Sequence, residues 1–409
     1  MKPLPLYGRH LRALGPTDDG VFHARLTDDP DLAPEARGAH VLLVRGDTAL
    51  AAGFRAYFRT DGDATAIAMR NAYMLGEELH HVRTGDVVRV DPARRSVNVL
   101  YRRSSPTNSI LVTERCDNYC LMCSQPPKPQ DDSYLVDEAF RWVHLVDPDT
   151  AELGITGGEP GLLGERLPQL VSHIERCLPR TALHVLSNGR RFADPALARA
   201  LAAAGHHDLM VGIPLYSDLP EEHDYVVQAR GAYSETLRGI LALKAAGVRV
   251  EIRTVMHAQT FARLPELATF IVRNLLFVDH VALMGLELMG FARSNLAELW
   301  IDPVEYQEQL AAAVEILDRA GMAVSVYNTP LCLLPEGLHR FARQSISDWK
   351  NAYTDECEGC TERGSCAGFF TSSTLRKSAH IRPFGARTSA SPTPASPIRP
   401  TLETLEQPT

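Results

Sequence analysis

Short apolar runs alternate with amphipathic segments through the middle of the chain, between residues 106 and 300. The runs are rich in β-branched side chains, which is typical of strands buried in a parallel sheet. The segments between them repeat apolar residues at helical spacing. The expected strands are Ser109–Val112, Glu152–Thr156, Ala182–Leu186, Leu209–Leu215, Arg249–Met256 and His280–Met284, and the expected helices are Asp137–Val146, Arg166–Cys177, Asp194–Ala204, Ser234–Ala246 and Leu264–Asn274. Six alternating repeats predict an α/β fold with right-handed crossovers, short of a closed eight-stranded barrel.

Residues 1–105 follow a different pattern, with alternating apolar and polar positions. Val21–Leu26 and Ala39–Val44 are expected strands, and Asp86–Asp91 and Ser96–Tyr101 predict a hairpin. We expect a small β-rich amino-terminal domain. Such a domain covers the barrel or supports dimerisation, or it docks a peptide or partner by strand addition to a sheet edge.

The segment from residue 301 to residue 384 begins with a helix signal. Asp302 is an expected N-cap with Pro303 in the first turn, and the helix is predicted to run to about Ala320. A strand, Ala323–Tyr327, then leads into a cysteine-rich stretch. Residues 385–409 are rich in Pro, Ser, Thr and Ala and are predicted to be disordered.

The composition is that of an ordinary soluble protein with room for two or three domains. The chain has 409 residues and a net charge of −8, so nothing points to nonspecific binding of nucleic acid or of an anionic membrane. No apolar stretch approaches a membrane span, and the first seven residues contain no apolar signal core. We expect a cytoplasmic protein, whose thiols stay reduced and are available to metals.

Three of the eight cysteines, Cys116, Cys120 and Cys123, follow the first expected strand directly. The carboxyl ends of strands carry the active sites of α/β barrels. Three thiolates this close can hold one face of a 4Fe–4S cluster and leave its fourth iron open to a small chelating molecule. A zinc knuckle or a loop disulfide is the alternative.

Polar and glycine-rich turns follow three of the later strands. Gly157-Gly158-Glu159-Pro160 ends the second strand, where glycine permits close backbone approach and Glu159 can accept from an ammonium group. Ser187 and Asn188 end the third strand, where the alternative is a turn without a ligand. Arg253 lies within an otherwise apolar strand. A buried arginine requires a partner, either a ligand carboxylate or an internal one such as Glu251 or Glu287.

A second group of thiols lies near the carboxyl end of the chain, in the spacing C-x2-C-x5-C. Cys357, Cys360 and Cys366, with the more distant Cys332, offer the four ligands of a closed 4Fe–4S cluster or of a zinc ion. Cys177 lies in an apolar helix and is expected to be part of the core. The histidines show no metal-like grouping, and most are expected to be structural or exposed: His206, His207, His223, His257 and His280.

The C-x3-C-x2-C motif followed by G-G-E-P resembles the signature of the radical S-adenosylmethionine (SAM) superfamily. The resemblance implies a partial (β/α)6 barrel and a 4Fe–4S cluster whose open iron binds SAM, which is cleaved reductively to methionine and a 5′-deoxyadenosyl radical. It implies that Gly157, Gly158 and Glu159 contact SAM, that Pro160 stiffens the loop, and that Ser187 and Asn188 lie near the ribose and methionine. Arg253 lies on a strand that often carries a SAM ligand.

Two departures from the superfamily pattern are visible. Met122 stands where an aromatic residue usually precedes the last cysteine, and the polarizable thioether is a similar apolar substitute. The fourth strand reads Val211-Gly-Ile-Pro-Leu-Tyr-Ser217, with glycine and proline near the usual serine. The ribose contact expected there falls to Tyr216 or Ser217.

The second group of thiols resembles the auxiliary-cluster cysteines of the SPASM/twitch class. One auxiliary 4Fe–4S cluster in a twitch-like region is implied, as an electron acceptor, an electron relay or a structural staple.

A more specific resemblance is to the HxsC family of His-Xaa-Ser system radical SAM maturases, over roughly residues 80 to 384. The segments that carry it are Thr113–Lys128, His184–Phe192, Gly212–Ser217, Asn274–Met284 and Ile346–Asn351. The family implies a peptide substrate with His-Xaa-Ser repeats, a second radical SAM protein of the HxsB type and an external electron donor. The alternatives are a small-molecule radical SAM enzyme of cofactor biosynthesis and a non-catalytic, cluster-bearing partner of a second enzyme.

Overall fold

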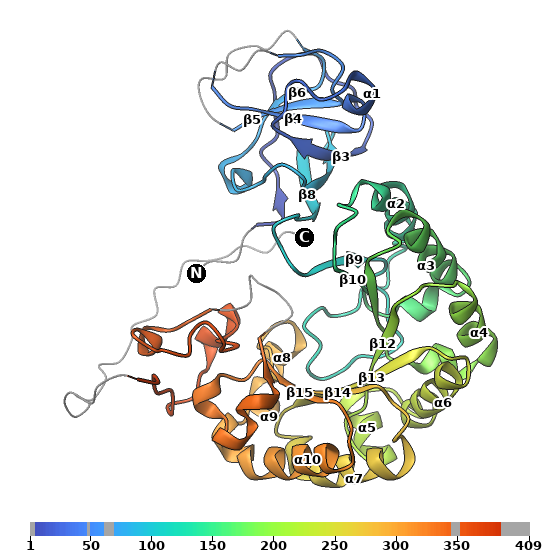
Figure 1. Cartoon of the computed structure of the whole chain (residues 1–409), viewed down its shortest axis with the longest axis vertical. Helices are drawn as coiled ribbons and strands as arrows, with labels where there is room; N and C mark the ends of the chain where they lie inside the picture. The colour runs from blue at the N-terminus through green and yellow to red at the C-terminus, as the bar shows by residue number, and fades with distance from the viewer. Residues whose placement is uncertain (1–4, 47–49, 61–68, 345–351, 386–409) are drawn as a thin grey trace.

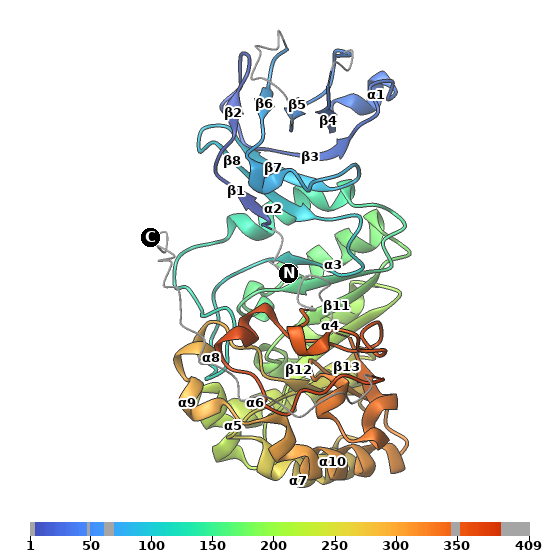
Figure 2. The same cartoon turned by 90° about the vertical axis from the view of Figure 1, so that its left-hand side faces the viewer.

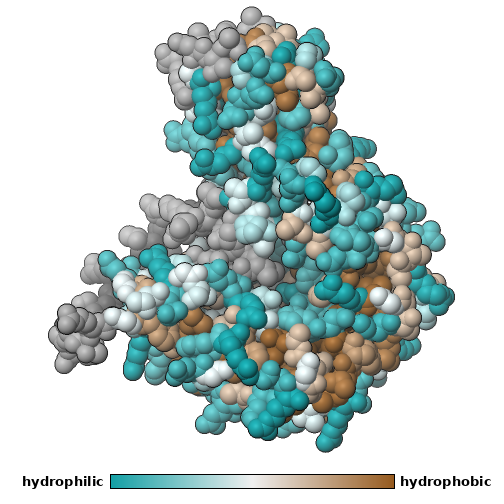
Figure 3. All heavy atoms as spheres, in the orientation of Figure 1, coloured by the Kyte–Doolittle hydropathy of each residue, from teal (hydrophilic) through white to brown (hydrophobic). Residues whose placement is uncertain are grey.

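The computed structural model describes residues 5–46, 50–60, 69–344 and 352–385. Two eight-stranded sheets organise these residues, a mixed sheet near the amino terminus and a fully parallel sheet after it. In space-filling view the first sheet forms a lobe that projects from the larger body (Figure 3). The predicted disorder of residues 386–409 and the segment Ile346–Asn351 lie outside the described residues.

The amino-terminal sheet has the strand order β1-β8-β7-β3-β4-β5-β6-β2. Its strands are β1 (Tyr7–Gly8), β2 (Arg12–Ala13), β3 (Phe22–Thr27), β4 (His40–Val44), β5 (Ala56–Arg59), β6 (Ala72–Met74), β7 (Val87–Asp91) and β8 (Ser96–Tyr101), with the short helix α1 (Pro34–Arg37). The predicted hairpin is confirmed, because β7 and β8 pair antiparallel. Strands β1, β2, β5 and β6 were not predicted.

The parallel sheet has the order β16-β15-β14-β13-β12-β11-β10-β9. Its strands are β9 (Asn108–Leu111), β10 (Glu152–Thr156), β11 (Ala182–Leu186), β12 (Leu209–Pro214), β13 (Arg249–Met256), β14 (His280–Gly285), β15 (Val324–Tyr327) and β16 (Ala342–Arg343). All six predicted strands form, and β15 and β16 extend the same sheet beyond them. The α/β class with a parallel partial barrel is confirmed, because the sheet curves with its helices outside (Figure 1).

Helices cover the convex face of this sheet (Figures 1 and 2). They are α2 (Tyr134–Trp142), α3 (Arg166–Cys177), α4 (Pro195–Ala203), α5 (Pro220–Val227), α6 (Ala232–Ala245), α7 (Leu264–Asn274), α8 (Phe291–Ser294), α9 (Leu296–Leu299) and α10 (Gln307–Arg319). The helix predicted from Asp302 begins instead as a 3-10 turn, Pro303–Tyr306, that Asp302 caps through Val304 N, and α10 follows.

The alternation of side chains along each strand divides them between the helices and the barrel interior. Leu153, Ile155, Val185, Val211 and Ile252 face the helices and belong to one large core cluster. The residues between them in sequence face inward and include several polar side chains, so the sequence of each strand sets what the interior can bind.

Candidate active site

The first cysteine loop leaves the carboxyl end of β9 and is fixed to the next loop by backbone hydrogen bonds. Gly158 N donates to Thr113 O at 2.8 Å, and Glu159 N donates to Arg115 O at 2.8 Å. A Cβ added at Gly158 would lie 2.2 Å from Arg115 O, and one at Gly157 would lie 2.4 Å from Thr113 O. The two glycines therefore allow the two loops to approach each other, and their predicted contact with SAM stays a prediction.

Asp132 fixes the start of the same loop, and sequence reasoning missed it. Its buried carboxylate accepts hydrogen bonds from Thr113 Oγ1, from the backbone N–H of Glu114 and from Arg115 Nε. Because Asp132 lies after the cysteine motif in no recognised pattern, only the folded chain shows its role.

The far side of the cysteine loop is fixed to helices α5 and α8. Tyr119 N and Leu121 N donate to Val227 O and Val226 O at 3.0 and 2.9 Å, and Phe291 N donates to Cys123 O at 2.8 Å. Met122 is buried in an apolar cluster with Tyr216 and both valines, which explains how methionine serves at this position. Helices α5 and α8, which follow β12 and β14, thus determine the path of the loop.

The three thiols of this loop lie close enough to influence one another. Burial raises the pKa of Cys116 to about 12, and the neighbouring charges of Glu159, Asp117 and Cys123 add to the effect. Burial and the charges of Cys123 and Cys116 likewise raise the pKa of Cys120. A metal that binds here must displace the thiol protons, as cysteine ligation always requires.

The spacing of the sulfur atoms bears on the two metal alternatives. Among the described residues, no three cysteine sulfurs lie within 4.8 Å of one another. Four ligands of one zinc ion would have sulfurs about 3.8 Å apart, given the length of a Zn–S bond. Three ligands of a cubic cluster bind three different iron atoms and lie further apart. Both alternatives, a cluster and a single metal ion, stay predictions for the two cysteine groups.

Glu159 is fully buried and locks the second strand's loop to the third. Its carboxylate accepts from Ser187 Oγ at 2.7 Å and from the backbone N–H of Asn188 and Gly161 at 2.6 Å each. Burial raises the pKa of Glu159 to about 7, against the lowering effect of these hydrogen bonds. The protein itself uses both carboxylate oxygens, so the geometry supports a positioning role, and the predicted ammonium contact stays a prediction.

Asn188 connects that turn to the first cysteine loop. Its Nδ2 donates to Asp117 Oδ1 at 2.6 Å and lies 4.0 Å from Cys116 Sγ. Gly189 follows with a φ of 81°, a left-handed conformation that glycine adopts without strain. The structure thus brings together the three turns that the sequence identified separately.

Arg253 has an internal partner in this structure. Its Nη1 donates to Glu251 Oε1 at 2.5 Å, and Glu251 Oε2 lies 2.7 Å from His280 Nδ1. Burial would raise the pKa of Glu251, but the hydrogen bond from His280 and the charge of Arg253 outweigh it and lower the pKa to about 2. Of the two alternatives, the internal ion pair is what the structure contains, and a ligand carboxylate stays a prediction.

The end of the fourth strand places Tyr216 under the cysteine loop. Burial and the charges of Cys120 and Cys123 raise its pKa. Ser217 Oγ instead donates to Glu222 Oε2 at 2.7 Å. Tyr216 is thus the nearer of the two candidates to the thiols.

The second group of thiols gathers residues that are far apart in the sequence. Cys332 follows β15, and burial with the charges of Cys366 and Cys357 raises its pKa, which indicates that the three are neighbours. Cys366 Sγ accepts from Leu331 N and Gly368 N, each at 3.3 Å. Cys360 Sγ accepts from Phe384 N at 3.3 Å. Backbone N–H groups aimed at sulfur are suited to thiolates that carry negative charge.

Two further predictions concern side chains outside these groups. Cys177 packs against the main core, as predicted. The prediction that the histidines show no metal-like grouping is wrong for one pair, because ligand atoms of His206, His207 and Glu175 lie within 4.8 Å of one another. Glu175 lies on α3, so the sequence could not show the group.

Comparisons with known proteins identify the central part of the chain. The model of the radical SAM superfamily matches residues 110–271. The PqqA peptide cyclase of Gluconobacter oxydans is 25% identical over 233 residues, which are 55% of this chain and 62% of that protein. The GTP 3′,8-cyclase of Paracoccus denitrificans is 29% identical over 172 residues, 41% of this chain and 46% of that protein. The chain spans about three fifths or less of the curated relatives it matches.

Solved structures show more distant likeness. SuiB of Streptococcus suis bound to S-adenosylmethionine is 14% identical, with a TM-score of 0.43, over 53% of this chain and 49% of that one. The enzyme anSMEcpe with bound AdoMet and the Kp18Cys peptide is 15% identical, with a TM-score of 0.46, over 68% of this chain and 92% of that one. None of the described helices is long and apolar enough to cross a membrane. The family match covers both the first cysteine loop and the G-G-E-P turn, so the segment of residues 110–271 matches the radical SAM superfamily.

Proposed function

We propose that the chain is a radical SAM maturase that modifies a ribosomally made peptide. The observation that carries the proposal is the convergence of Cys116, Cys120 and Cys123 with the G-G-E-P and Ser187-Asn188 turns at the carboxyl end of one parallel sheet. The similarity to two PqqA peptide cyclases supports a peptide substrate. The resemblance to the HxsC family favours a peptide substrate with His-Xaa-Ser repeats. It also favours a partner protein of the HxsB type and an external electron donor for the reaction.

Under this proposal the chain has a β-rich domain at residues 1–105, a partial barrel at 106–300, a twitch-like region at 301–384 and a tail at 385–409. The proposed SAM-cluster ligands are Cys116, Cys120 and Cys123; the proposed SAM contacts are Gly157, Gly158, Glu159, Pro160, Ser187, Asn188 and Arg253; the proposed auxiliary-cluster ligands are Cys332, Cys357, Cys360 and Cys366. When bound, a 4Fe–4S cluster with SAM supplies reductive cleavage of SAM to methionine and a 5′-deoxyadenosyl radical that removes a hydrogen atom from the substrate.

The residues of the chain orient this chemistry and exclude water from it. Glu159 and Asn188 set the relative positions of the loops, and the apolar cluster around Met122 and Tyr216 closes the space beneath the thiols. An auxiliary cluster held by the second group of thiols would accept the electron that a substrate radical loses when a new bond or double bond forms.

The intact mass of the His-Xaa-Ser peptide after anaerobic co-expression tests the proposal. The peptide is expressed with this chain and its partner, and a parallel culture carries Cys120→Ala. We expect a mass change that disappears in the variant. The same change in both cultures would assign catalysis to the partner and leave this chain a non-catalytic component.

A small-molecule substrate is the second candidate, favoured by the similarity to a GTP 3′,8-cyclase. In that case the purified enzyme would make 5′-deoxyadenosine with a nucleotide and leave the peptide mass unchanged in both cultures.

A further inference from the structure

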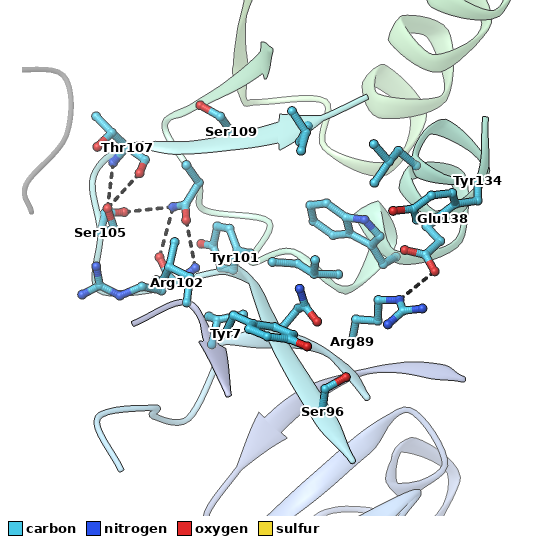
Figure 4. A pocket seen from close by; sticks show the side chains of 18 of the residues that line it. Tyr7, Arg89, Ser96, Tyr101, Arg102, Ser105, Thr107, Ser109, Tyr134 and Glu138 are labelled. Carbon is cyan, nitrogen blue, oxygen red and sulfur yellow. Dashed lines mark hydrogen bonds and ion pairs between the residues drawn. The ribbon is translucent and has the colours of Figure 1, made fainter. Parts of the chain in front are cut away.

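A large cavity lies between the amino-terminal sheet and the barrel. It is a groove of about 620 Å³, with β8 and β1 on one side and β9 and α2 on the other (Figure 4). Figure 4 shows Tyr7 and Ser96 at one wall and Ser109 on the opposite strand. No residue of the proposed active site lines it, so its purpose requires a separate explanation.

The barrel contributes a free strand edge to this groove. Strand β9 is the last strand of the parallel sheet and pairs only with β10 within the described residues. Val112 N donates to Thr156 O of β10, so Ile110 and Val112 direct their backbone groups toward β10. By the same alternation, Ser109 and Leu111 direct their N–H and C=O groups away from β10, and both residues line the groove.

The groove is preformed at one end. The side chain of Asn108 accepts from Arg102 N at 2.8 Å and donates to Arg102 O at 3.1 Å and to Ser105 O at 3.2 Å. These hydrogen bonds fix the connection between β8 and β9 (Figure 4). A ligand that binds here therefore needs to order little of the protein, and binding loses little conformational entropy.

Exposed apolar side chains concentrate along the groove. Leu6, Tyr7 and Tyr134 are 41%, 43% and 54% exposed, although large hydrophobic side chains are normally covered. Trp142 forms the buried floor beside Tyr134. Aromatic side chains of this kind bind alternate residues of an extended peptide, whose backbone pairs with the strand edge.

The charge of the groove is opposite in sign to that of the chain. Arg89, Arg94 and Arg102 line it with a single carboxylate, Glu138, which pairs with Arg89 at 2.8 Å. The buried carboxylate of Asp91 lies 3.5 Å from Arg89 Nη1 and 4.0 Å from Arg94 Nε, so three arginines face two carboxylates. The whole chain carries a net charge of −8. A local excess of arginine favours a guest with acidic residues and speeds its approach.

The groove also connects to the interior of the barrel. Thr107, Asn108 and Ser109 line both this groove and a second cavity of about 340 Å³, which Glu251 and Arg253 line from the inside. Strand β9 ends at Leu111, directly before the loop that carries Cys116. The second cavity lies at the amino ends of β10 to β14, so a peptide on the edge of β9 has neighbouring residues at that opening of the barrel, and the cysteine loop lies at the other end of the strands.

We propose that this groove binds an extended, acidic segment of the peptide substrate as an added strand on the free edge of β9. The inference rests on the proposed function and names the part of the chain that holds the substrate outside the reaction centre. Ser109 and Leu111 donate to and accept from the backbone of the peptide, Tyr134 and Tyr7 cover its apolar side chains, and the exposed Arg94 faces its carboxylates.

The test compares two substitutions of one residue. Ser109→Pro removes an N–H that points to the groove and leaves the bonds to β10 in place, which is where a strand tolerates proline. Ser109→Ala keeps that N–H and removes only the hydroxyl. Binding of the fluorescein-labelled precursor peptide to the cluster-loaded enzyme is followed by fluorescence anisotropy. We expect Kd to rise at least tenfold for Ser109→Pro and to stay within twofold of wild type for Ser109→Ala.

A second variant guards against misfolding of the first. Arg94 is 81% exposed and lies 4.0 Å from the buried Asp91, so Arg94→Gln removes its charge without placing a second carboxylate beside Asp91. We expect Kd to rise several-fold and the salt dependence of binding to weaken. Normal binding by Ser109→Pro and Arg94→Gln, or equal losses for Ser109→Pro and Ser109→Ala, would overturn the inference.

The two proposals fail in different ways. If the peptide is modified normally and binds all variants equally, the groove assignment is wrong and the maturase function stands. If wild type neither binds nor modifies the peptide while it still forms 5′-deoxyadenosine, the peptide function fails, and the groove assignment fails with it.

Discussion

The two groups of cysteines differ in what holds them in place. The first loop is tied by backbone hydrogen bonds to the loops and helices around it, including Val226, Val227 and Phe291. The second group lies in residues 331–333 and 354–368, among 3-10 turns, where many hydrogen bonds run within the region itself. The first set is therefore positioned by the barrel, and the second depends more on its own ligation.

The helix pair α8 and α9 lies between the two regions. Phe291 N at the start of α8 donates to Cys123 O, and the guanidinium of Arg376 lies 3.8 Å from the centroid of the Trp300 ring just after α9. Figures 1 and 2 both show the carboxyl-terminal segment beside α8. The segment of residues 291–300 therefore contacts both regions.

The largest expected difference comes from removing one thiol in each region. Cys120→Ala should reduce formation of 5′-deoxyadenosine at least a thousandfold, since the proposed cluster loses a ligand, and should leave the fold intact because the loop is held by other contacts. Cys357→Ala should halve the iron content, keep SAM cleavage, and expose residues 352–385 to protease. Iron analysis, 5′-deoxyadenosine assay and limited proteolysis measure the difference. Equal protease sensitivity of both variants would contradict it.

Acid should weaken the first region before the second. Burial lowers the pKa of His257 to about 3 and that of His223 to about 4, and both rings pack against Tyr216 under the first loop. As pH falls below about 6.5, the unfolded chain takes up protons that the folded histidines do not, so the free energy of unfolding falls by about 1 kcal/mol per histidine per pH unit.

Urea unfolding at pH 7 and pH 5 measures this effect, with hydrogen exchange to locate it. His257→Asn is the matched control, because the asparagine oxygen can accept from Gln259 N as His257 Nδ1 does and does not titrate. Between pH 7 and pH 5, the free energy of unfolding should fall less for His257→Asn than for wild type. An unchanged slope would show that His257 titrates normally in the folded chain.

A methyl group at the contact between the cysteine loop and the G-G-E-P loop should lower the free energy of unfolding by about 1–3 kcal/mol, the usual range for overpacking. In Gly158→Ala the added Cβ would lie 2.2 Å from Arg115 O, so the loops must separate. Gly337→Ala is the control beside the second region, because a Cβ there meets nothing within 4 Å. Thermal unfolding and iron content compare the two. A Gly158→Ala protein as stable as the control would contradict the tight loop contact.

The smallest effect is expected for Glu159→Gln. It should lower the free energy of unfolding by about 1 kcal/mol at low pH, because an amide group replaces only one of the two accepting oxygens. At about pH 4.5 wild type should be the more stable of the two, and this difference should narrow and then change sign as pH rises through 7, because a shift of this size removes about 3 kcal/mol from wild type. Wild-type Glu159 has a raised pKa of about 7, so its folded state holds a proton in this range and loses stability as pH rises, whereas glutamine does not titrate. A constant difference between pH 5 and pH 8 would show that Glu159 is ionised throughout.

The six central strands and the two cysteine motifs could be predicted from the sequence, since both depend on local patterns. Strand β10 required only the apolar alternation of Glu152–Thr156, and the cysteine loop required only its spacing. Asp132, the partner of Arg253 and the group formed by Glu175, His206 and His207 could not be predicted in this way. Each of these contacts joins side chains from different elements, and a local sequence pattern does not predict contacts between distant elements.

The sequence by itself determined the periodicity of the barrel, the chemistry of the thiols and the order of the turns that surround them. The tertiary structure decided which of these residues meet. It placed Cys332 beside Cys366 and surrounded the carboxylate of Glu159 with hydrogen-bond donors of the protein itself. Among the residues that the structure describes, it left one edge of β9 without a paired strand beside the amino-terminal sheet. The physical reason is that hydrophobic periodicity is a property of neighbouring residues, whereas ion pairs, buried hydrogen bonds and free strand edges depend on how distant segments pack.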